Sequence, residues 1–302
     1  MPSPAPPCPL CGGDSRHALT AGDRNRELTR ERFVYNRCRS CASVFMVDPP
    51  DDMARYYVGA YHGFGADGEP EWRENPTLLE VERFRAQTLS ELAGTGPLID
   101  IGAGAGGFAA AAAHAGFDVS AIEMDARCCA YMSDRLAVNA VCSDDPIAAL
   151  SELPPARVIS MWHSLEHLRD PAKMLAAAAA RLQPGGVLAL GVPNPGSLQF
   201  RLLRTRWAHL DAPRHLCLMP EDALVSHLQS LGLARLDAMT GDPFGVICSI
   251  HGWTYALRRR PARGESAKIT IHAGRLLTRA LGPFENARRD GAALTLLAVK
   301  RV

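Results

Sequence analysis

The chain has 302 residues, of which 47% are hydrophobic and 22% are charged, and its formal net charge is +1 at pH 7. This is the composition of a globular protein with a sizeable core, and the near-neutral charge gives no basic field for binding nucleic acid. The sequence has no uninterrupted run of about 18 apolar residues, so we expect no membrane span. The N-terminus lacks the basic and apolar regions of a signal peptide, and the cysteine spacing favours reduced thiols. We therefore expect a cytoplasmic protein.

Two C-x-x-C pairs lie near the start of the chain. Cys8 and Cys11 form the first pair, and Cys38 and Cys41 form the second. Two cysteines three apart on a tight turn direct both sulfurs at one ion, and two such turns complete the four-thiolate tetrahedron of structural zinc. A redox dithiol or two chance turns are the alternative interpretations. We predict a zinc-ribbon-like module over residues 1–50, with a Zn²⁺ ion that supports the fold.

Residues 51–94 are expected to form a linker or lid followed by a leading helix. The linker is rich in tyrosine and glycine, namely Tyr56, Tyr57, Gly59, Tyr61, Gly63 and Gly65. Such a stretch either folds over a neighbouring pocket or simply connects two parts, and the sequence does not decide between them.

A short apolar strand at residues 98–101 contains Asp100 and opens into a glycine-rich turn. Glycines let the backbone approach a ligand closely. The turn also fits a dinucleotide-binding pattern, but a dinucleotide places an anionic pyrophosphate there, which Asp100 would repel. S-adenosylmethionine (SAM) instead offers an ammonium and a sulfonium, which a carboxylate attracts. The predicted SAM contacts in this turn are Asp100, Gly102, Ala103, Gly104 and Gly106.

Strand and helix patterns alternate after this turn, which predicts a parallel sheet with helices on both faces. The expected strands are residues 98–101, 119–122, 137–142, 158–162, 187–192, 234–239 and 293–299. A helix starting at Asp170-Pro171 is expected to continue to Gln183 and to stop at Pro184-Gly185-Gly186. Residues 95–302 are thus expected to form one domain, with an insertion at about 241–290.

Acidic residues at two further strand ends are placed to bind an adenosine. Glu123 ends the second strand, about 20 residues past the glycine turn, where an acid binds the two ribose hydroxyls. Asp144 follows the third strand and is a candidate acceptor for the adenine amino group, although a plain loop acid or helix cap fits it nearly as well. Met124, Trp162 and His163 complete the predicted cofactor contacts.

These features together resemble a class I SAM-dependent methyltransferase over roughly residues 76–302. The resemblance rests on the turn at 100–106, on Glu123 and on the segments 163–171 and 182–186. It implies a doubly wound, Rossmann-like, seven-stranded methyltransferase sheet that binds SAM. The 163–167 segment is similar to its counterpart in quinone-pathway O-methyltransferases. The two C-x-x-C pairs resemble those of zinc-bearing C-methyltransferases that act on nucleotide-linked sugars.

Catalytic candidates follow from where a ligand binds in such a sheet, beyond the carboxyl ends of the strands. The candidates are His163, His209 and His215, and Arg214 is expected beside His215 on an anionic part of the substrate. Arg214-His215-Leu216 resembles the place where the sugar C-methyltransferases carry a catalytic histidine. The competing interpretation of each histidine is a hydrogen-bonded core residue. Glu166 and His167 either bind a metal, as the quinone-pathway resemblance implies, or form a capped turn.

The favoured function is methyl transfer from SAM to an oxygen or carbon of a small or carrier-linked metabolite. The alternatives are an inactive zinc-ribbon and Rossmann-like binding protein, and an NAD-dependent oxidoreductase, which Asp100 disfavours. We expect no nucleic-acid partner and no membrane span. Assembly as a homodimer is left open by the sequence.

Overall fold

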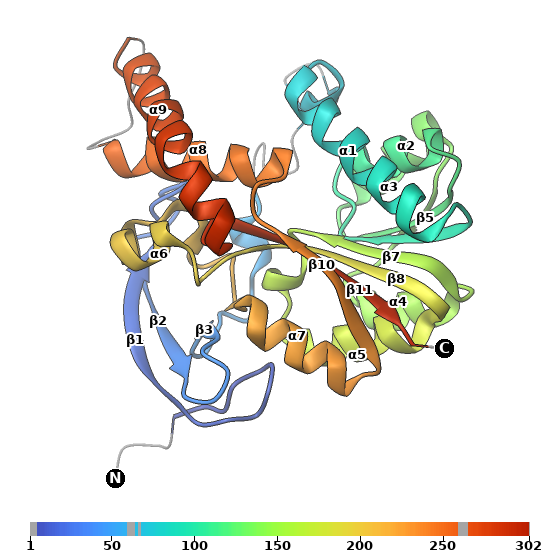
Figure 1. The fold of residues 1–302 in the computed structure, drawn as a ribbon, viewed down its shortest axis with the longest axis horizontal. Coiled ribbons are helices and arrows are strands. Elements are labelled where there is room, and N and C mark those ends of the chain that lie inside the picture. The colour runs from blue at the N-terminus through green and yellow to red at the C-terminus, as the bar shows by residue number, and fades with distance from the viewer. Residues whose placement is uncertain (1–4, 59–63, 66–67, 259–264, 302) are drawn as a thin grey trace.

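A seven-stranded sheet forms the centre of the molecule, for which a computed structural model describes residues 5–58, 64–65, 68–258 and 265–301 (Figure 1). The strand order is β10-β11-β8-β7-β4-β5-β6. The strands are β4 (Pro97–Ile101), β5 (Asp118–Glu123), β6 (Asn139–Cys142), β7 (Ala156–Trp162), β8 (Leu182–Pro193), β10 (Leu233–Met239) and β11 (Ala293–Lys300). β11 runs antiparallel to both its neighbours, and the remaining pairs in this sheet are parallel. The predicted doubly wound seven-stranded sheet is confirmed.

Helices cover both faces of this sheet, as Figure 1 shows. One face packs against α1 (Pro76–Ala93), α2 (Gly107–His114) and α3 (Ala126–Leu136), and the other against α4 (Pro146–Glu152), α5 (Pro171–Arg181) and α7 (Glu221–Ser230). Successive strand residues point to opposite faces. Leu98 accordingly belongs to the cluster on the α1 face, whereas Ile99 and Ile101 belong to the cluster on the α5 face. The strands read as continuous apolar runs because both faces are buried.

Several helices begin where the sequence provides a capping side chain followed by proline. Asn75 accepts hydrogen bonds from two backbone amides of α1, and Asp145 does the same for α4. The end of α5 differs from the expectation. This helix ends at Arg181, and Leu182 already belongs to β8, so the proline and glycines that follow lie inside the strand rather than after the helix.

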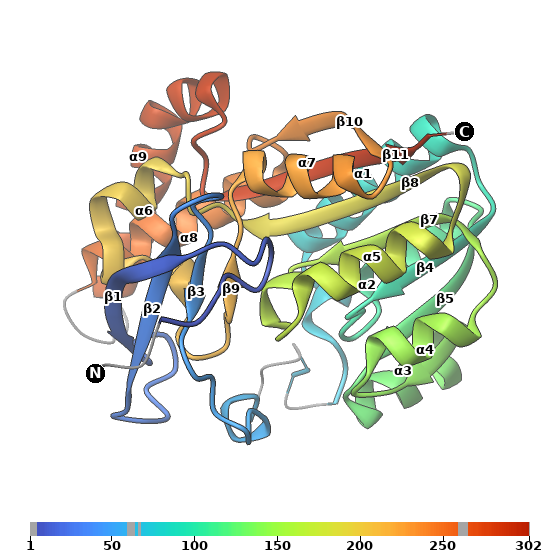
Figure 2. The same ribbon diagram turned by 90° about the horizontal axis from the view of Figure 1, so that it is seen from below.

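A second, four-stranded sheet combines strands of the predicted N-terminal module with one strand of the predicted 95–302 domain. It contains β1 (Ser15–Gly22), β2 (Arg32–Cys38), β3 (Val44–Met46) and β9 (Cys217–Leu218). β9 comes from the 95–302 segment of the chain and pairs antiparallel with β3, as Figure 2 illustrates. The N-terminal sheet therefore extends beyond residue 50 and includes residues from the 95–302 segment.

Two helices occupy the predicted insertion: α8 (Pro243–Leu257) and α9 (Glu265–Arg288), which pack against each other near the N-terminal sheet (Figure 1). The remaining short helices are α6 (Leu198–Leu203), η1 (Ala54–Tyr56), η3 (Glu71–Arg73), η4 (Leu165–His167), η5 (Arg204–Arg206) and η6 (Ala208–Leu210). Gly59, Tyr61 and Gly63 of the predicted lid lie outside the described residues.

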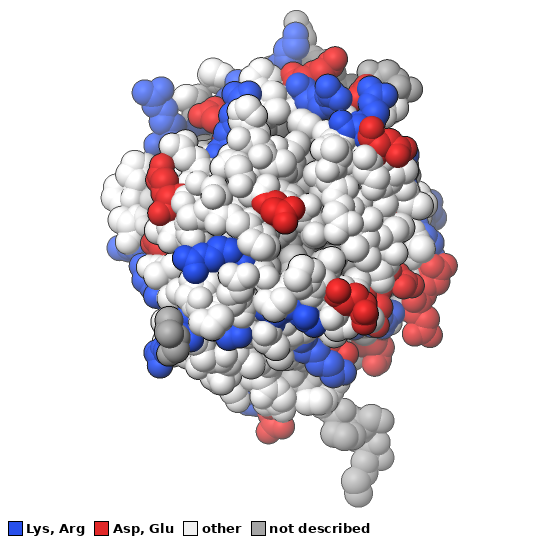
Figure 3. Space-filling view, turned by 90° about the vertical axis from the view of Figure 1, so that its right-hand side faces the viewer, with Lys and Arg blue, Asp and Glu red and all other residues white. Residues whose placement is uncertain are grey.

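Charged side chains of both signs are interspersed with uncharged surface on the face shown in Figure 3. Within the described part of the chain, no helix is both long enough and apolar enough to cross a membrane.

Candidate functional site

The glycine turn connects β4 to α2 at the carboxyl edge of the central sheet. Gly102 has φ +75°, and a Cβ there would lie 2.4 Å from Cβ of Ser164. Gly106 has φ +78° and is the N-cap of α2. Both positions require glycine, because a left-handed backbone and the close approach of a neighbour exclude other side chains. The turn thus keeps its backbone exposed to a ligand at the start of a helix.

Asp100 lies on β4 at the centre of this edge. Its side chain is 2% exposed, and Ser160 on β7 donates a hydrogen bond of 2.7 Å to Oδ1. Burial raises the pKa of Asp100 to about 7, because a charged carboxylate is disfavoured away from water. A cationic ligand group would recover that lost stabilisation.

Glu123 lies at the end of β5, beside the glycine turn. Its Oε2 accepts a hydrogen bond of 2.8 Å from the amide of Gly104, and Oε1 accepts bonds from the amides of Met124 and Asp125. A carboxylate has about four acceptor positions, so about one position, on Oε2, remains for a hydroxyl group. The structure therefore joins Glu123 directly to the turn that follows Asp100.

The other predicted cofactor contacts surround these two acids. Ala103 lies in the turn itself, with its amide 3.4 Å from the carbonyl of Ile122. Met124 is 55% exposed. Asp144 is exposed and directly precedes Asp145, the N-cap of α4. These positions lie along the edge where an adenosine would bind in this fold.

Trp162 and His163 lie at the end of β7. Trp162 makes an edge contact with Phe108 of α2, at a centroid distance of 5.4 Å. His163 has φ +57°, a left-handed conformation that is uncommon for a residue with a side chain and tends to mark functional sites. Its ring lies 4.6 Å from that of Phe244 at the start of α8. His163 therefore joins the sheet edge to the insertion.

A buried acid, Glu166, lies among three histidines. Its Oε1 is 3.4 Å from Nδ1 of His163 and 3.9 Å from Nε2 of His215. Among the described residues, no group donates a hydrogen bond of regular geometry to either carboxylate oxygen. Burial alone would raise the pKa of Glu166, but the contact with His163 and the charges of His163, His215 and His167 lower it to about 2. Glu166 is thus an anion in a buried position, with three imidazoles near it.

His215 is buried and held in one orientation. Its Nδ1 lies 2.9 Å from the carbonyl of His209, and its ring is packed edge-on against His167 at 4.7 Å. Because the carbonyl is an acceptor, Nδ1 carries the proton and Nε2, which faces Glu166, is the basic nitrogen. Glu166, His167 and His215 also offer three ligand atoms within 4.8 Å of one another.

His209 is placed differently from the other candidates. Its Nε2 lies 2.8 Å from the carbonyl of Cys248, and its ring contacts those of Trp207 and His251. Burial lowers the pKa of His209 to about 3, so the ring is neutral at pH 7. These contacts fit the alternative interpretation, a hydrogen-bonded core histidine that ties α8 to the 207–218 segment.

The expected contact of Arg214 with a substrate is wrong. Its side chain is completely buried and donates to Asp211 through Nε at 2.8 Å and to Asp23 through Nη2 at 2.9 Å. Both partners are acids that need a cation, since an unpaired buried charge is strongly unfavourable. Arg214 therefore links the N-terminal part of the chain to the segment that carries His215.

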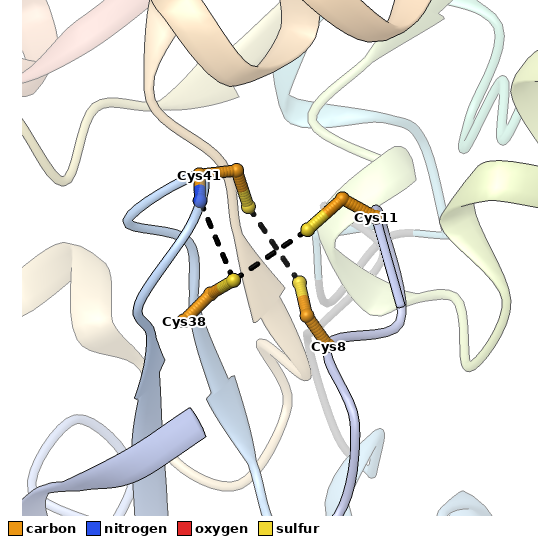
Figure 4. A group of neighbouring side chains, drawn as sticks. All are labelled: Cys8, Cys11, Cys38 and Cys41. Carbon is orange, nitrogen blue, oxygen red and sulfur yellow. Dashed lines mark hydrogen bonds between the residues drawn. The ribbon is translucent and has the colours of Figure 1, made fainter. Parts of the chain in front are cut away.

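The four cysteines of the two C-x-x-C pairs converge on one point, as Figure 4 shows. Sγ of Cys8 is 3.7 Å from Sγ of Cys41, and Sγ of Cys11 is 3.5 Å from Sγ of Cys38. A disulfide requires about 2.05 Å, whereas a tetrahedron with Zn–S bonds of about 2.3 Å places its sulfurs roughly 3.8 Å apart. The donor set and its spacing fit a zinc ion with four thiolate ligands.

Four residues near the site were not predicted from the sequence. Nε1 of Trp72 donates a hydrogen bond to the carbonyl of Ala105 in the glycine turn. The hydroxyl of Tyr57 lies 2.9 Å from Nδ1 of His167. Phe244 lies against His163, which follows β7, and Arg85 lies against Trp162 at the end of β7. The aromatic composition of the linker was a signal for Tyr57 and Trp72, but nothing in the local sequence singles out Phe244 or Arg85.

Comparison with known proteins identifies the family. Residues 72–237 match the family model described as a methyltransferase domain, and this is more than half of the chain, so the protein belongs to that family. With its seven-stranded sheet and reversed β11, it is a class I SAM-dependent methyltransferase. No curated protein matches the chain.

Solved structures share this fold at low sequence identity. A SAM-dependent methyltransferase from Archaeoglobus fulgidus is 17% identical, with a TM-score of 0.51, over 76% of this chain and 96% of that one. A protein assigned as a sarcosine dimethylglycine methyltransferase from Galdieria sulphuraria is 18% identical, with a TM-score of 0.52, over 83% and 99% of the two chains.

Proposed function

We propose that the protein transfers the methyl group of SAM to an oxygen or carbon atom of a small or carrier-linked metabolite. The observation that carries this proposal is the placement of two acids around one glycine turn. Asp100 is suited to the ammonium of the methionine part, and Glu123 to the ribose hydroxyls. The turn between them leaves room for the cofactor at Gly104, where φ is +54° and a Cβ would meet no protein atom within 4 Å.

The acceptor side is assigned to the cluster around Glu166. When bound, SAM supplies an electrophilic methyl group on a cationic sulfur. His215 removes a proton from the acceptor at Nε2, while its Nδ1–H remains bonded to the carbonyl of His209. Glu166, with Oε1 3.9 Å from that nitrogen, stabilises the imidazolium that forms. A base of this kind is needed for hydroxyl and carbon acceptors, which carry a proton that must leave.

We assign a structural Zn²⁺ to Cys8, Cys11, Cys38 and Cys41. Four protein thiolates leave no open coordination position, and a closed tetrahedral site supports folding rather than catalysis. Cys38 ends β2 of the N-terminal sheet and the other three cysteines lie just outside its strands, whereas Asp100 and Glu123 belong to the central sheet. The ion is therefore proposed to act through the fold of that sheet.

Calorimetry with S-adenosylhomocysteine (SAH), the demethylated product, tests the cofactor site. Glu123→Ala removes acceptors that are charged, and each such hydrogen bond contributes roughly 1.5–3 kcal/mol. We expect the Kd for SAH to rise about tenfold or more. Asp134→Ala, an exposed acid on α3, is the matched control and should bind SAH like the wild type. A Glu123→Ala protein that is folded and binds SAH within about twofold of the wild type would contradict the assignment.

The type of acceptor atom is tested with SAM that carries a ¹³C-labelled methyl group. The protein is incubated with an extract of small metabolites, and the labelled product is examined by NMR. Methyl groups on oxygen, carbon and nitrogen have distinct chemical shifts. A label found on nitrogen would contradict the O- or C-acceptor assignment while leaving methyl transfer itself intact.

A further inference from the structure

The outward side of α9 carries a row of exposed apolar side chains, here called the apolar stripe. Ile269, Leu276 and Phe284 are 68%, 56% and 69% exposed. Ala273 and Ala280 occupy the turns between them, so the row follows the spacing i, i+4, i+7, i+11 and i+15. Residues at this spacing lie along one side of a helix. Single exposed apolar residues are ordinary, whereas a continuous row of them is typical of an interaction surface.

The opposite side of α9 is used for packing against α8. Thr278 and Glu285 on this side are 8% and 2% exposed. A Cβ at Gly274 would lie 2.2 Å from Oγ1 of Thr254 in α8, so the two helices approach each other closely there. Figure 1 shows α9 at the periphery of the molecule. The apolar stripe therefore faces away from the core that this chain builds for itself.

Cations lie along one flank of the apolar stripe. Lys268, Arg275 and Arg279 are exposed, and the helical repeat of 3.6 residues brings them to the same side of α9. The α9 side chains that the structure describes are those of residues 268–288, and among them Glu285 is the sole acid. Because Glu285 is buried, the described outer surface of this helix is apolar and positively charged.

This combination of charge and apolar surface indicates what covers the helix. In a two-fold pair of copies, each α9 would meet the same surface on the other, so two cationic flanks would face each other and repel. An anionic lipid surface instead offers negative headgroups to the flank and acyl chains to the apolar stripe. We propose that the apolar stripe and its cationic flank dock the protein on a membrane that contains anionic lipids, with α9 lying in the plane of the surface.

The docking surface is separated from the candidate site by one helix. α8, against which α9 packs, provides the carbonyl of Cys248 that lies beside Nε2 of His209. The same helix carries Phe244, whose ring contacts that of His163. Docking through α9 would thus hold the histidine side of the candidate site near the lipid headgroups. This inference goes beyond the proposed function and does not depend on it.

Sedimentation with lipid vesicles tests the docking surface, using the 302-residue chain loaded with zinc. We expect the protein to bind vesicles of phosphatidylcholine that contain about 30% phosphatidylglycerol, because their surface is negatively charged. Binding to vesicles of phosphatidylcholine alone should be about tenfold weaker or less, since only the apolar contribution remains. Added salt should weaken the binding to the anionic vesicles, because it screens the charges.

Two double variants of α9 separate the two contributions. Arg275→Gln with Arg279→Gln removes two cations, each of which contributes roughly fivefold near an anionic surface, so the partition coefficient should fall roughly 30-fold. Leu276→Ser with Phe284→Ser removes apolar contact with the acyl region and should lower it about tenfold or more. All four side chains are exposed, so both variants should unfold at the same temperature as the wild type.

Matched controls carry the same changes on other elements. Arg83→Gln with Arg301→Gln, and Leu92→Ser with Leu236→Ser, alter exposed residues of α1, β10 and the chain end and should bind vesicles like the wild type. No binding to the anionic vesicles, equal binding to both kinds, or unchanged binding in the two α9 variants overturns the proposal. A dimer that the α9 variants dissociate, without vesicle binding, would show instead that a second copy covers the apolar stripe.

Discussion

At the scale of single residues, the site depends on two buried acids with opposite pKa shifts. Burial raises the pKa of Asp100 to about 7, whereas the surrounding imidazoles lower that of Glu166 to about 2. Two carboxyl groups whose pKa values are shifted in opposite directions are suited to different roles in a site. Asp100 gains most from a cationic ligand, and Glu166 is already an anion before any ligand arrives.

The affinity for SAH is expected to depend on pH through Asp100. The ammonium group requires the ionised carboxylate, so affinity is full above pH 7 and falls as the pH drops through the pKa of the free protein. One coupled proton gives about a tenfold weakening per pH unit below that pKa, so the Kd should rise roughly tenfold between pH 8 and pH 6. Calorimetry across this range measures it. Asp100→Asn should bind more weakly with a flat profile, and a sloping profile in that variant would exclude Asp100 as the source.

His215 is expected to affect turnover and not cofactor binding. General-base assistance contributes about 10²- to 10⁴-fold, so His215→Ala should lose most of its methyl transfer into the labelled product while its Kd for SAH stays within about twofold. His114→Ala, an exposed histidine on α2, is the control for both measurements. Full transfer activity in His215→Ala would show that another group takes the proton.

At the scale of elements, local patterns were predictable from the sequence and distant pairings were not. The strand and glycine turn at 98–107 could be identified because an apolar run, an acid and the glycines all lie within one short window. β9 has only two residues, Cys217 and Leu218, and exists because β3 lies beside it. The role expected for Arg214 was wrong for the same reason, since its partner Asp23 is far away in the sequence. Arg85 likewise depends on Trp162 and Phe244, which belong to other elements.

The ion pair between Asp23 and Arg214 joins two connecting segments that lie far apart in the sequence, and both side chains are fully buried. Removing one partner of a buried pair leaves the other charge uncompensated, which costs about 3–5 kcal/mol. Because Arg214 keeps Asp211, we expect Asp23→Ala to lower the free energy of unfolding by about 3 kcal/mol. Urea denaturation measures this change.

An exposed pair in the same protein provides the comparison. Lys173 and Asp170 also lie 2.9 Å apart, but both are largely exposed. Lys173→Ala should change the free energy of unfolding by less than about 1 kcal/mol, because water and salt screen such a pair. If Asp23→Ala and Lys173→Ala destabilise the protein equally, the buried pair does not hold the two parts together.

At the scale of the whole molecule, the four-cysteine site is connected to the proposed catalytic histidine through a short series of contacts. Cys38 ends β2, and on the same strand Tyr35 donates a hydrogen bond of 3.0 Å to the carbonyl of His215. Met46 at the end of β3 donates to the carbonyl of Leu216. The N-terminal sheet therefore supports the segment that carries His215 rather than standing apart from the candidate site.

Metal removal should consequently loosen the 207–218 segment before it affects the cofactor turn. A small metal-bound module folds together with its ion, and local opening exposes backbone amides to exchange. In hydrogen exchange followed by mass spectrometry, Cys11→Ser or chelator-treated protein should lose protection in residues 8–46 and in 207–218. Residues 98–107 and 119–123, which belong to the central sheet, should keep theirs, and SAH should still bind. Protection of 207–218 that survives while residues 8–46 exchange freely would show that the central domain holds the His215 segment without the N-terminal sheet.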